Sequence, residues 1–306
     1  MKFITAEKLR KDLGLEKLNN IKSQGARIKT TEINRPGIQF SGFFDGFPYS
    51  RIQLVGKIEK QFLNTLAKER REEIFENFFS YDIPCIIISR QLEAPIELLK
   101  AAEKHQKNVF RSSLNTTKLL NILTNYLEDC LAPTTRIHGV LMDIHGIGTL
   151  ITGKSGIGKS EAAIELINKG HLLVADDAVE VKRIGQEYLT GYAPDITRYM
   201  LEVRGIGIMD IKTLYGVGAI KFRTNINLVI RLEEWDINEP YDRLGLDERY
   251  REILGIKVAE VVIPVKPARN IAVIAEVAAK NYRLKNMGYH SAKSFSDRLT
   301  KYLTKK

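Results

Sequence analysis

The sequence predicts two α/β domains, the second built around a phosphate-binding loop. Strand-like and helix-like segments alternate through residues 1–131, which is typical of an α/β domain. Proline and small polar residues at Ala132–Thr135 then mark a boundary. Beyond it, a glycine-rich segment between an apolar strand and a helix matches the pattern G-x-x-x-x-G-K-[ST] at every fixed position. We therefore expect one domain over residues 1–131 and a P-loop domain over residues 132–306.

In the first domain, hydrophobic spacing predicts helices and strands in alternation. The expected helices are Ala6–Leu13, Gln61–Phe79, Ile96–Lys107 and Thr116–Leu131, and the expected strands are Ile38–Phe44, Arg51–Val55 and Cys85–Ile88. No catalytic constellation is evident in this domain, so its role stays open.

The second domain is expected to be richer in strands. The expected strands are His138–Ile144, Gly148–Thr152, Leu172–Ala175, Val179–Lys182, Tyr188–Thr190, Leu228–Leu232 and Val258–Ile263, and the expected helices are the one after the P-loop, Ile271–Lys285 and Ser291–Leu303.

Charge and composition exclude some classes of protein and leave others open. The net charge of +10 invites a nucleic-acid partner, but the basic residues are spread along the chain, and an acidic protein or several phosphate groups would explain the excess equally well. No apolar run approaches a membrane span, the N-terminus lacks the apolar core of a signal peptide, and the two cysteines are not spaced as a ligand pair. We expect a cytoplasmic protein.

The P-loop predicts a site for nucleotide phosphates. Its glycines let backbone N–H groups turn toward phosphate oxygens, and the helix N-terminus adds partial positive charge. Lys159 is expected to reach the β- and γ-phosphates, and the Ser160 hydroxyl to bind Mg²⁺. The alternative is a glycine-rich turn that binds nothing. The nucleotide-binding residues are therefore predicted to be Gly153, Lys154, Ser155, Gly156, Ile157, Gly158, Lys159 and Ser160.

Two carboxylates, Asp176 and Asp177, follow directly on the apolar strand Leu172–Ala175. In phosphoryl-transfer sites, carboxylates at such a strand end hold metal or position a nucleophile. Only one helix and one turn separate them from Lys159, so their strand is expected to neighbour the P-loop strand. The alternative is a solvated Asp-Asp turn.

Other charged residues are weaker candidates. Glu202 and Arg204 flank a pair of glycines in Leu201–Asp210, which is expected to be a loop offering a metal ligand and a phosphate contact. His138 opens an apolar strand, where a histidine is more often structural. Arg243 lies in a polar stretch in which most arginines form surface ion pairs. Lys266 and Arg269 lie in a segment stiffened by two prolines, either a linker or an anion-binding segment ahead of a helix.

Taken together, these segments resemble the HPr kinase/phosphorylase family, bacterial enzymes that phosphorylate a serine of the phosphocarrier HPr. In the first domain the resemblance is carried by Arg35–Gly37, Gly42–Asp45 and Arg51–Leu54. In the second it is carried by His138–Val140, the P-loop, Val174–Asp177, Pro264–Arg269 and, most specifically, Leu201–Asp210.

The resemblance implies a C-terminal fold similar to phosphoenolpyruvate carboxykinase, a homohexamer, and a part in carbon catabolite regulation. It also implies ATP as phosphoryl donor, Mg²⁺, and a reverse reaction in which inorganic phosphate removes the seryl phosphate as pyrophosphate.

The same resemblance assigns roles to residues. Asp177 would be the general base, and the acid in reverse. Lys159 would hold phosphates, and Ser160 and Glu202 would bind Mg²⁺ with Asp176 in support. His138 would hold phosphate on the acceptor side, Arg243 would stabilise the transferred phosphoryl group, and Arg204, Lys266 and Arg269 would support the site. Two other hypotheses for the function remain: a P-loop kinase of a small-molecule metabolite, and a nucleic-acid-binding regulator with an ATP switch.

Overall fold

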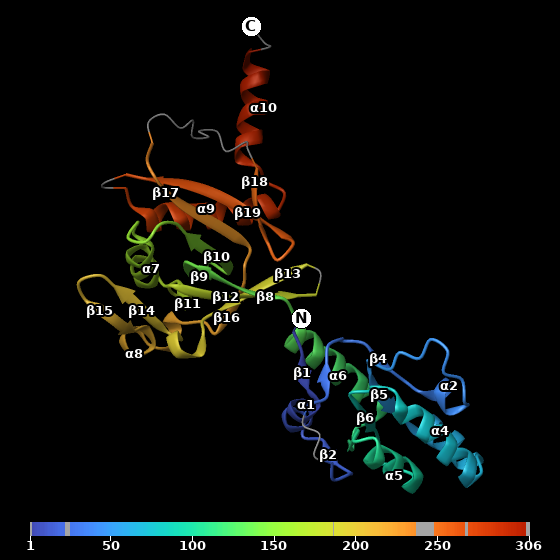
Figure 1. The fold of residues 1–306 in the computed structure, drawn as a ribbon. Coiled ribbons are helices and arrows are strands. Elements are labelled where there is room, and N and C mark those ends of the chain that lie inside the picture. The colour runs from blue at the N-terminus through green and yellow to red at the C-terminus, as the bar shows by residue number, and fades with distance from the viewer. Residues whose placement is uncertain (1, 22–24, 186, 237–247, 267–268, 304–306) are drawn as a thin grey trace. The chain divides into compact units, whose positions relative to one another are not determined.

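The computed structural model describes residues 2–21, 25–185, 187–236, 248–266 and 269–303. Its contacts divide the chain into two compact units, Met1–Ala132 and Pro133–Lys306 (Figure 1). Each unit has its own sheets and hydrophobic clusters. No described helix has the length and apolar character needed to cross a membrane.

A five-stranded sheet of order β2-β7-β6-β5-β4 forms the centre of the N-terminal unit. Strands β4 to β7 run parallel, while β2 is antiparallel to β7, and β1 and β3 form a separate antiparallel pair. The strands are β1 (Ile4–Thr5), β2 (Glu16–Lys17), β3 (Arg27–Ile28), β4 (Ile33–Asn34), β5 (Ile52–Val55), β6 (Cys85–Ile88) and β7 (Asn108–Arg111).

Helices cover both faces of this sheet, because alternate strand residues enter different clusters. Ile86 and Ile88 of β6 pack with α3, α4 and α5, whereas Cys85 and Ile87 pack with α1 and α6. Two-sided burial is typical of parallel sheets and explains why β6 is a continuous apolar run and why all four residues of β5 are buried, Gln53 included. The helices are α1 (Ala6–Asp12), α2 (Gly37–Phe40), α3 (Lys57–Thr65), α4 (Lys68–Ser80), α5 (Ile96–Lys104) and α6 (Thr116–Leu131).

The expected strand Ile38–Phe44 is wrong. The segment forms the single helical turn α2 after Pro36, and Gly42, with φ of +99°, follows it. Alternation would place Ile38 and Phe40 on one buried face, yet Ile38 is exposed and only Phe40 is buried, against the rings of Phe75 and Phe78. A short apolar run does not by itself distinguish helix from strand.

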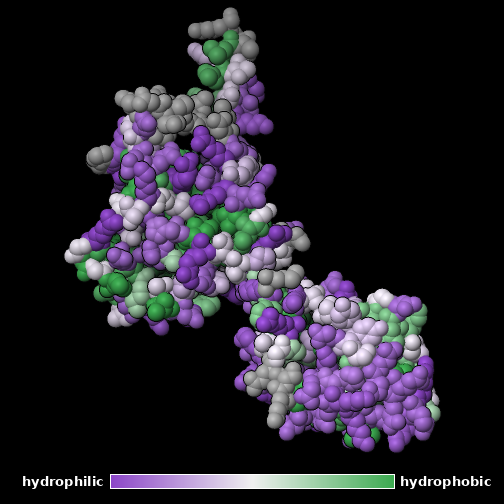
Figure 2. All heavy atoms as spheres, viewed as in Figure 1, coloured by the Kyte–Doolittle hydropathy of each residue, from purple (hydrophilic) through white to green (hydrophobic). Residues whose placement is uncertain are grey.

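The expected helix Gln61–Phe79 is also interrupted. The chain is extended at Leu66 and Ala67, so α3 ends at Thr65 and α4 begins at Lys68. The break redirects the chain so that both helices bury their apolar faces in one cluster. The polar face of α4 carries charges of both signs that pair with one another, as Arg70 does with Glu73. Figure 2 shows that the visible surface of this unit is mostly hydrophilic.

The C-terminal unit is layered, with helices on one face of a sheet and a second sheet on the other. The six-stranded sheet has the order β11-β9-β10-β17-β19-β18, in which β10, β17 and β19 are parallel. Its strands are β9 (Val140–Ile144), β10 (Ile147–Thr152), β11 (Leu172–Ala175), β17 (Leu228–Glu234), β18 (Arg249–Ile253) and β19 (Ile256–Val265).

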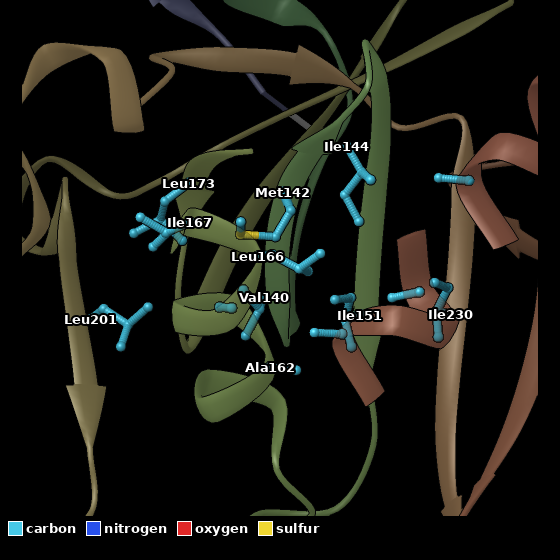
Figure 3. Packing of buried hydrophobic residues seen from close by; sticks show 14 of the residues in the cluster. Val140, Met142, Ile144, Ile151, Ala162, Leu166, Ile167, Leu173, Leu201 and Ile230 are labelled. Carbon is cyan, nitrogen blue, oxygen red and sulfur yellow. The ribbon is translucent and has the colours of Figure 1, made fainter. Parts of the chain in front are cut away.

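Alternate residues of this sheet pack against the helices and against the second sheet. Val140, Met142 and Ile151 face Ala162 and Leu166 of α7, as Figure 3 shows, whereas Leu141 and Leu150 pack against the second sheet. The second sheet is antiparallel, with the order β16-β13-β12-β8. Its strands are β8 (Thr134–His138), β12 (Ala178–Ile184), β13 (Tyr188–Tyr192) and β16 (Arg223–Asn225).

The remaining elements of this unit are a hairpin, helices and short 3₁₀ turns. They are the hairpin β14 (Met200–Val203) and β15 (Gly207–Asp210), the helices α7 (Lys159–Asn168), α8 (Ile211–Tyr215), α9 (Ile271–Asn286) and α10 (Ser291–Leu303), and the 3₁₀ turns η1 (Asp195–Thr197) and η2 (Val217–Ala219).

Two strand predictions in this unit need correction. The expected strand His138–Ile144 is divided at Gly139, because His138 ends β8 in one sheet and β9 begins in the other. A side chain at Gly139 would meet the carbonyl oxygen of Ile151 at 2.5 Å, so glycine permits this crossing. The strand that carries Asp176 and Asp177 was expected beside the P-loop strand, but β9 lies between β11 and β10.

Candidate active site

The P-loop joins the end of β10 to the start of α7 (Figure 1). Gly158 has a φ of +103° at the N-cap of α7, a conformation that favours glycine. Lys159 is buried, and its Nζ donates hydrogen bonds to the carbonyl oxygens of Gly153 and Lys154, each at 3.0 Å. Burial lowers the pKa of Lys159 from its ordinary value. The loop thus holds a desolvated cation against two neutral acceptors.

Asp176 is a buried carboxylate in contact with the first turn of the P-loop helix α7. Its side chain accepts hydrogen bonds from the Ser160 hydroxyl at 3.3 Å and from the backbone N–H of Glu202 at 3.0 Å. Burial raises the pKa of Asp176, and these hydrogen bonds act in the opposite direction. Asp176 therefore ties the P-loop helix to the β14–β15 hairpin.

Asp177 differs from its neighbour because its side chain is 69 % exposed. Its backbone has a φ of +62°, in the left-handed region that is unusual outside glycine. One carboxylate oxygen lies 3.0 Å from Nδ1 of His138. The register of β8 and β12 explains the approach, since Ala178 pairs directly with His138. The Asp-Asp pair thus points one carboxylate inward and leaves the other accessible.

The segment expected to be a glycine loop is the hairpin β14–β15, with Gly205 in its turn. The Arg204 guanidinium donates a hydrogen bond to the Ser155 hydroxyl at 2.9 Å. It also lies so near Gly156 that a Cβ there would be 2.6 Å from Nη1. The hairpin therefore packs on the phosphate-binding loop through an arginine.

Most of the predicted site residues line one small cavity of about 90 Å³. Basic and acidic groups meet there: the cavity is lined by His138, Ser155, Gly156, Gly158, Lys159, Ser160, Glu161, Asp176, Asp177, Glu202 and Arg204. His138 also lines a second, more open cavity of about 1340 Å³, which reaches Thr152 at the end of β10 and Gly153 and Lys154 of the P-loop.

Sequence reasoning missed Arg231, Arg251 and Trp235, which line that larger cavity beside the P-loop. Arg251 donates a hydrogen bond to the Thr152 hydroxyl at 3.2 Å. These residues belong to β17, β18 and the segment after β17, and the parallel and antiparallel pairing of those strands with their neighbours brings them to the P-loop edge. No local pattern signals this, because each arginine alone has the sequence context of a surface ion pair.

Lys266 and Arg269 do not line the small cavity. Lys266 Nζ lies 3.4 Å from the centre of the Trp235 ring, and the Arg269 guanidinium donates a hydrogen bond to the Pro264 carbonyl at 2.7 Å. Lys266 thus contacts Trp235, which lines the larger cavity. Arg243 lies outside the described residues.

A P-loop whose lysine and serine line one cavity with two carboxylates has the arrangement of a P-loop phosphotransferase. Family comparison makes this more specific. The sequence model "HPr Serine kinase N terminus" matches residues 4–127, and "HPr Serine kinase C-terminal domain" matches residues 129–299. The chain belongs to the HPr serine kinase family.

Individual relatives match over the whole chain. An HPr kinase/phosphorylase of Alkaliphilus metalliredigens is 62% identical over 306 residues, covering 100% of this chain and 99% of the relative. One from Thermoanaerobacter sp. is 49% identical over 303 residues, covering 99% of both chains. A solved structure of the Hpr(Ser) kinase/phosphatase from Coxiella burnetii is 35% identical, with a TM-score of 0.48, and covers 53% of this chain and 98% of that one.

Proposed function

We propose that this protein phosphorylates a regulatory serine of HPr with ATP and removes that phosphate with inorganic phosphate, releasing pyrophosphate. The observation that carries the proposal is the small cavity in which Lys159, Ser160, Asp177 and His138 meet. The names of the full-length relatives, HPr kinase/phosphorylase, support both directions and the substrate.

Asp177 is the proposed proton acceptor. Its carboxylate is accessible, lines the cavity and lies 3.0 Å from His138. In the forward direction, the seryl hydroxyl gives its proton to Asp177 as the seryl oxygen bonds to the γ-phosphorus and the bond to ADP breaks. In reverse, Asp177 returns the proton to the seryl oxygen as the phosphoryl group passes to inorganic phosphate. His138 fixes the carboxylate and holds phosphate on the acceptor side.

Lys159 and the P-loop N–H groups are proposed to hold the β- and γ-phosphates of ATP. In the described structure the ammonium of Lys159 is bound only by two neutral carbonyls, so its charge is available to an anion. Arg204 adds a second cation beside the loop, where it is held by its hydrogen bond to the Ser155 hydroxyl. Positioning and charge neutralisation of this kind supply most of the rate of phosphoryl transfer.

The residues present fit Mg²⁺. Ser160, Asp176 and Glu202 offer a hydroxyl and two carboxylates on one small cavity, and hard oxygen donors are the ligands that Mg²⁺ prefers. Ser160 and Glu202 would hold the ion, with Asp176 in support through its hydrogen bonds to the Ser160 hydroxyl and to the backbone N–H of Glu202. When bound, the ion neutralises charge on the phosphate oxygens.

The family resemblance suggests roles for the remaining cations. Arg243 would stabilise the phosphoryl group in transfer, and Lys266 and Arg269 would serve the phosphorolytic direction. The resemblance also leads us to propose a homohexamer acting in the cytoplasm, in a response to carbon supply, and a C-terminal fold related to phosphoenolpyruvate carboxykinase.

The direct test incubates purified protein with HPr and γ-labelled ATP. Label should appear on an HPr serine, and seryl-phosphorylated HPr with inorganic phosphate should release pyrophosphate. A protein that leaves HPr unlabelled while hydrolysing ATP or labelling a metabolite would instead be a small-molecule kinase.

A further inference from the structure

Three side chains of the types that ligate transition metals meet near the C-terminal end of α7. One ring nitrogen each of His145 and His171 and one carboxylate oxygen of Glu276 lie within 4.8 Å of one another. The two imidazole rings are in edge contact, with centroids 4.5 Å apart, and His145 Nε2 lies 3.0 Å from Glu276 Oε1. The P-loop is at the other end of α7, and a helix of ten residues is about 15 Å long. The cluster is therefore separate from the phosphate site.

His145 is fixed by a tight turn between β9 and β10. His145 and Gly146 have φ of +54° and +84°, the left-handed pair that suits a two-residue hairpin. The N–H of Gly146 donates a hydrogen bond to the Asp143 carboxylate at 2.7 Å. This turn holds the imidazole over α9, which carries Glu276.

His171 is fixed by the end of α7. Its N–H donates to the Leu166 carbonyl at 3.0 Å, and the N–H of Gly170 donates to the Ile167 carbonyl at 2.9 Å, which is the Schellman arrangement that ends a helix. The residue is 4 % exposed. Its Nε2 is buried without a hydrogen-bond partner among the described residues. A buried polar atom of this kind needs an explanation, and a bound cation would supply one.

We propose that His145, His171 and Glu276 bind a divalent transition-metal ion of the zinc class. Two imidazoles and a carboxylate are a donor set that suits zinc, cobalt or nickel, whereas Mg²⁺ prefers oxygen donors alone. Bonds of about 2.0–2.2 Å to a common ion bring ligand atoms somewhat closer than 4.8 Å, so modest side-chain rotations complete the site. The proposal does not depend on the enzyme's substrate.

Two lysines face the same carboxylate. Lys280 lies 2.6 Å from Glu276 Oε1, and Lys169 lies 3.7 Å from Oε2. They neutralise Glu276 when no metal is bound, and a divalent ion has to compete with them. Lys280 is 53 % exposed and can turn to solvent. Removing its charge should therefore strengthen metal binding.

The bound ion would link three elements of the C-terminal unit: the β9–β10 turn, the end of α7 and the middle of α9. Because a ligand that binds only the folded state stabilises it, the metal should raise the thermal stability of the protein. Activity of the P-loop site is expected to change little.

The test uses the full chain without nucleotide. Co²⁺ binding is followed by its visible absorption, and Zn²⁺ affinity by competition with a chromophoric chelator. The variant is His145→Asn, because asparagine tolerates the left-handed turn and His145 is exposed. Loss of a ligand should weaken binding at least about tenfold, since even indirect partners of a metal contribute about 10–100-fold. Lys280→Gln should tighten binding, and Zn²⁺ should raise the Tm of the wild type more than that of His145→Asn.

His105→Asn is the matched control. His105 also lies 3.0 Å from a glutamate, Glu76, with Lys104 alongside, but this group is not a three-ligand cluster. The affinity of the His105→Asn variant for Zn²⁺ should equal that of the wild type. The Glu202→Gln variant should also keep its affinity for Zn²⁺ at the His145–His171–Glu276 cluster. This result would distinguish the cluster from any metal site at the P-loop. Absence of one saturable site, or an unchanged affinity in His145→Asn, would show that the cluster is only a packing contact.

Discussion

Parallel strands end in polar groups in both units, but those groups are used differently. At the carboxyl edge of the N-terminal sheet, Glu59 is buried, accepts a hydrogen bond from the N–H of Gly56 at 2.9 Å, and pairs with Arg35 at 2.8 Å. The Ser89 and Thr116 hydroxyls likewise bond to each other at 2.8 Å. These groups satisfy one another and hold together the segments that follow the strands.

At the P-loop edge of the C-terminal unit, the charges are kept apart around a cavity. Lys159 forms no ion pair among the described residues and is held by two neutral carbonyls. Asp177 is largely exposed, while Asp176 is buried with its hydrogen bonds satisfied by Ser160 and Glu202. The comparison teaches that a buried charge in no direct ion pair indicates a ligand, whereas a closed ion pair at the same kind of edge indicates stabilisation.

The largest effect is expected from Lys159→Ala. It removes the P-loop cation that the fold leaves available, so turnover should fall about 10²–10³-fold or more, and ATP should bind about 10–100-fold more weakly. Titration with a fluorescent ATP analogue measures the affinity, and thermal unfolding should show little loss of stability. Unchanged affinity together with unchanged turnover would mean that the loop is not a nucleotide site.

An intermediate and selective effect is expected from Arg269→Ala. The reverse reaction brings a further phosphate dianion against an already anionic phosphoseryl protein, so it depends more on nearby cations. Loss of a charge-assisted contact costs about 1.5–3 kcal/mol, or roughly ten- to a hundredfold in phosphorolysis, with a smaller loss in phosphorylation. The paired measurement is HPr labelling and pyrophosphate release. An equal fall in both rates would assign the segment to folding or HPr docking.

The smallest effect on activity is expected from Glu59→Gln. The amide oxygen can still accept the N–H of Gly56, but Arg35 loses the negative charge of its partner, which should destabilise the N-terminal unit by about 1–3 kcal/mol. Chemical denaturation measures that loss. Phosphorylation of HPr per folded molecule should equal the wild-type value, and a marked fall would make the N-terminal edge part of the functional site.

What the sequence could predict depended on how local the signal was. The P-loop and the two carboxylates are contiguous motifs, and residues of both line one cavity. The contact of His138 with Asp177 depends on the register of β8 with β12, and the position of Arg251 depends on the pairing of β18, which no local pattern contains. The position of β9 between β11 and β10 and the helical turn Gly37–Phe40 were missed for the same reason, because each depends on packing partners distant in the sequence.

The central claim is that one accessible carboxylate, Asp177, moves the proton in both directions of a single site. The direct measurement is the rate of HPr phosphorylation and of phosphorolysis by Asp177→Asn, together with its affinity for ATP. Both rates should fall by a similar factor of about 10²–10⁴, with nucleotide affinity nearly unchanged. Rates within a few-fold of wild type, or a loss confined to one direction, would contradict the claim.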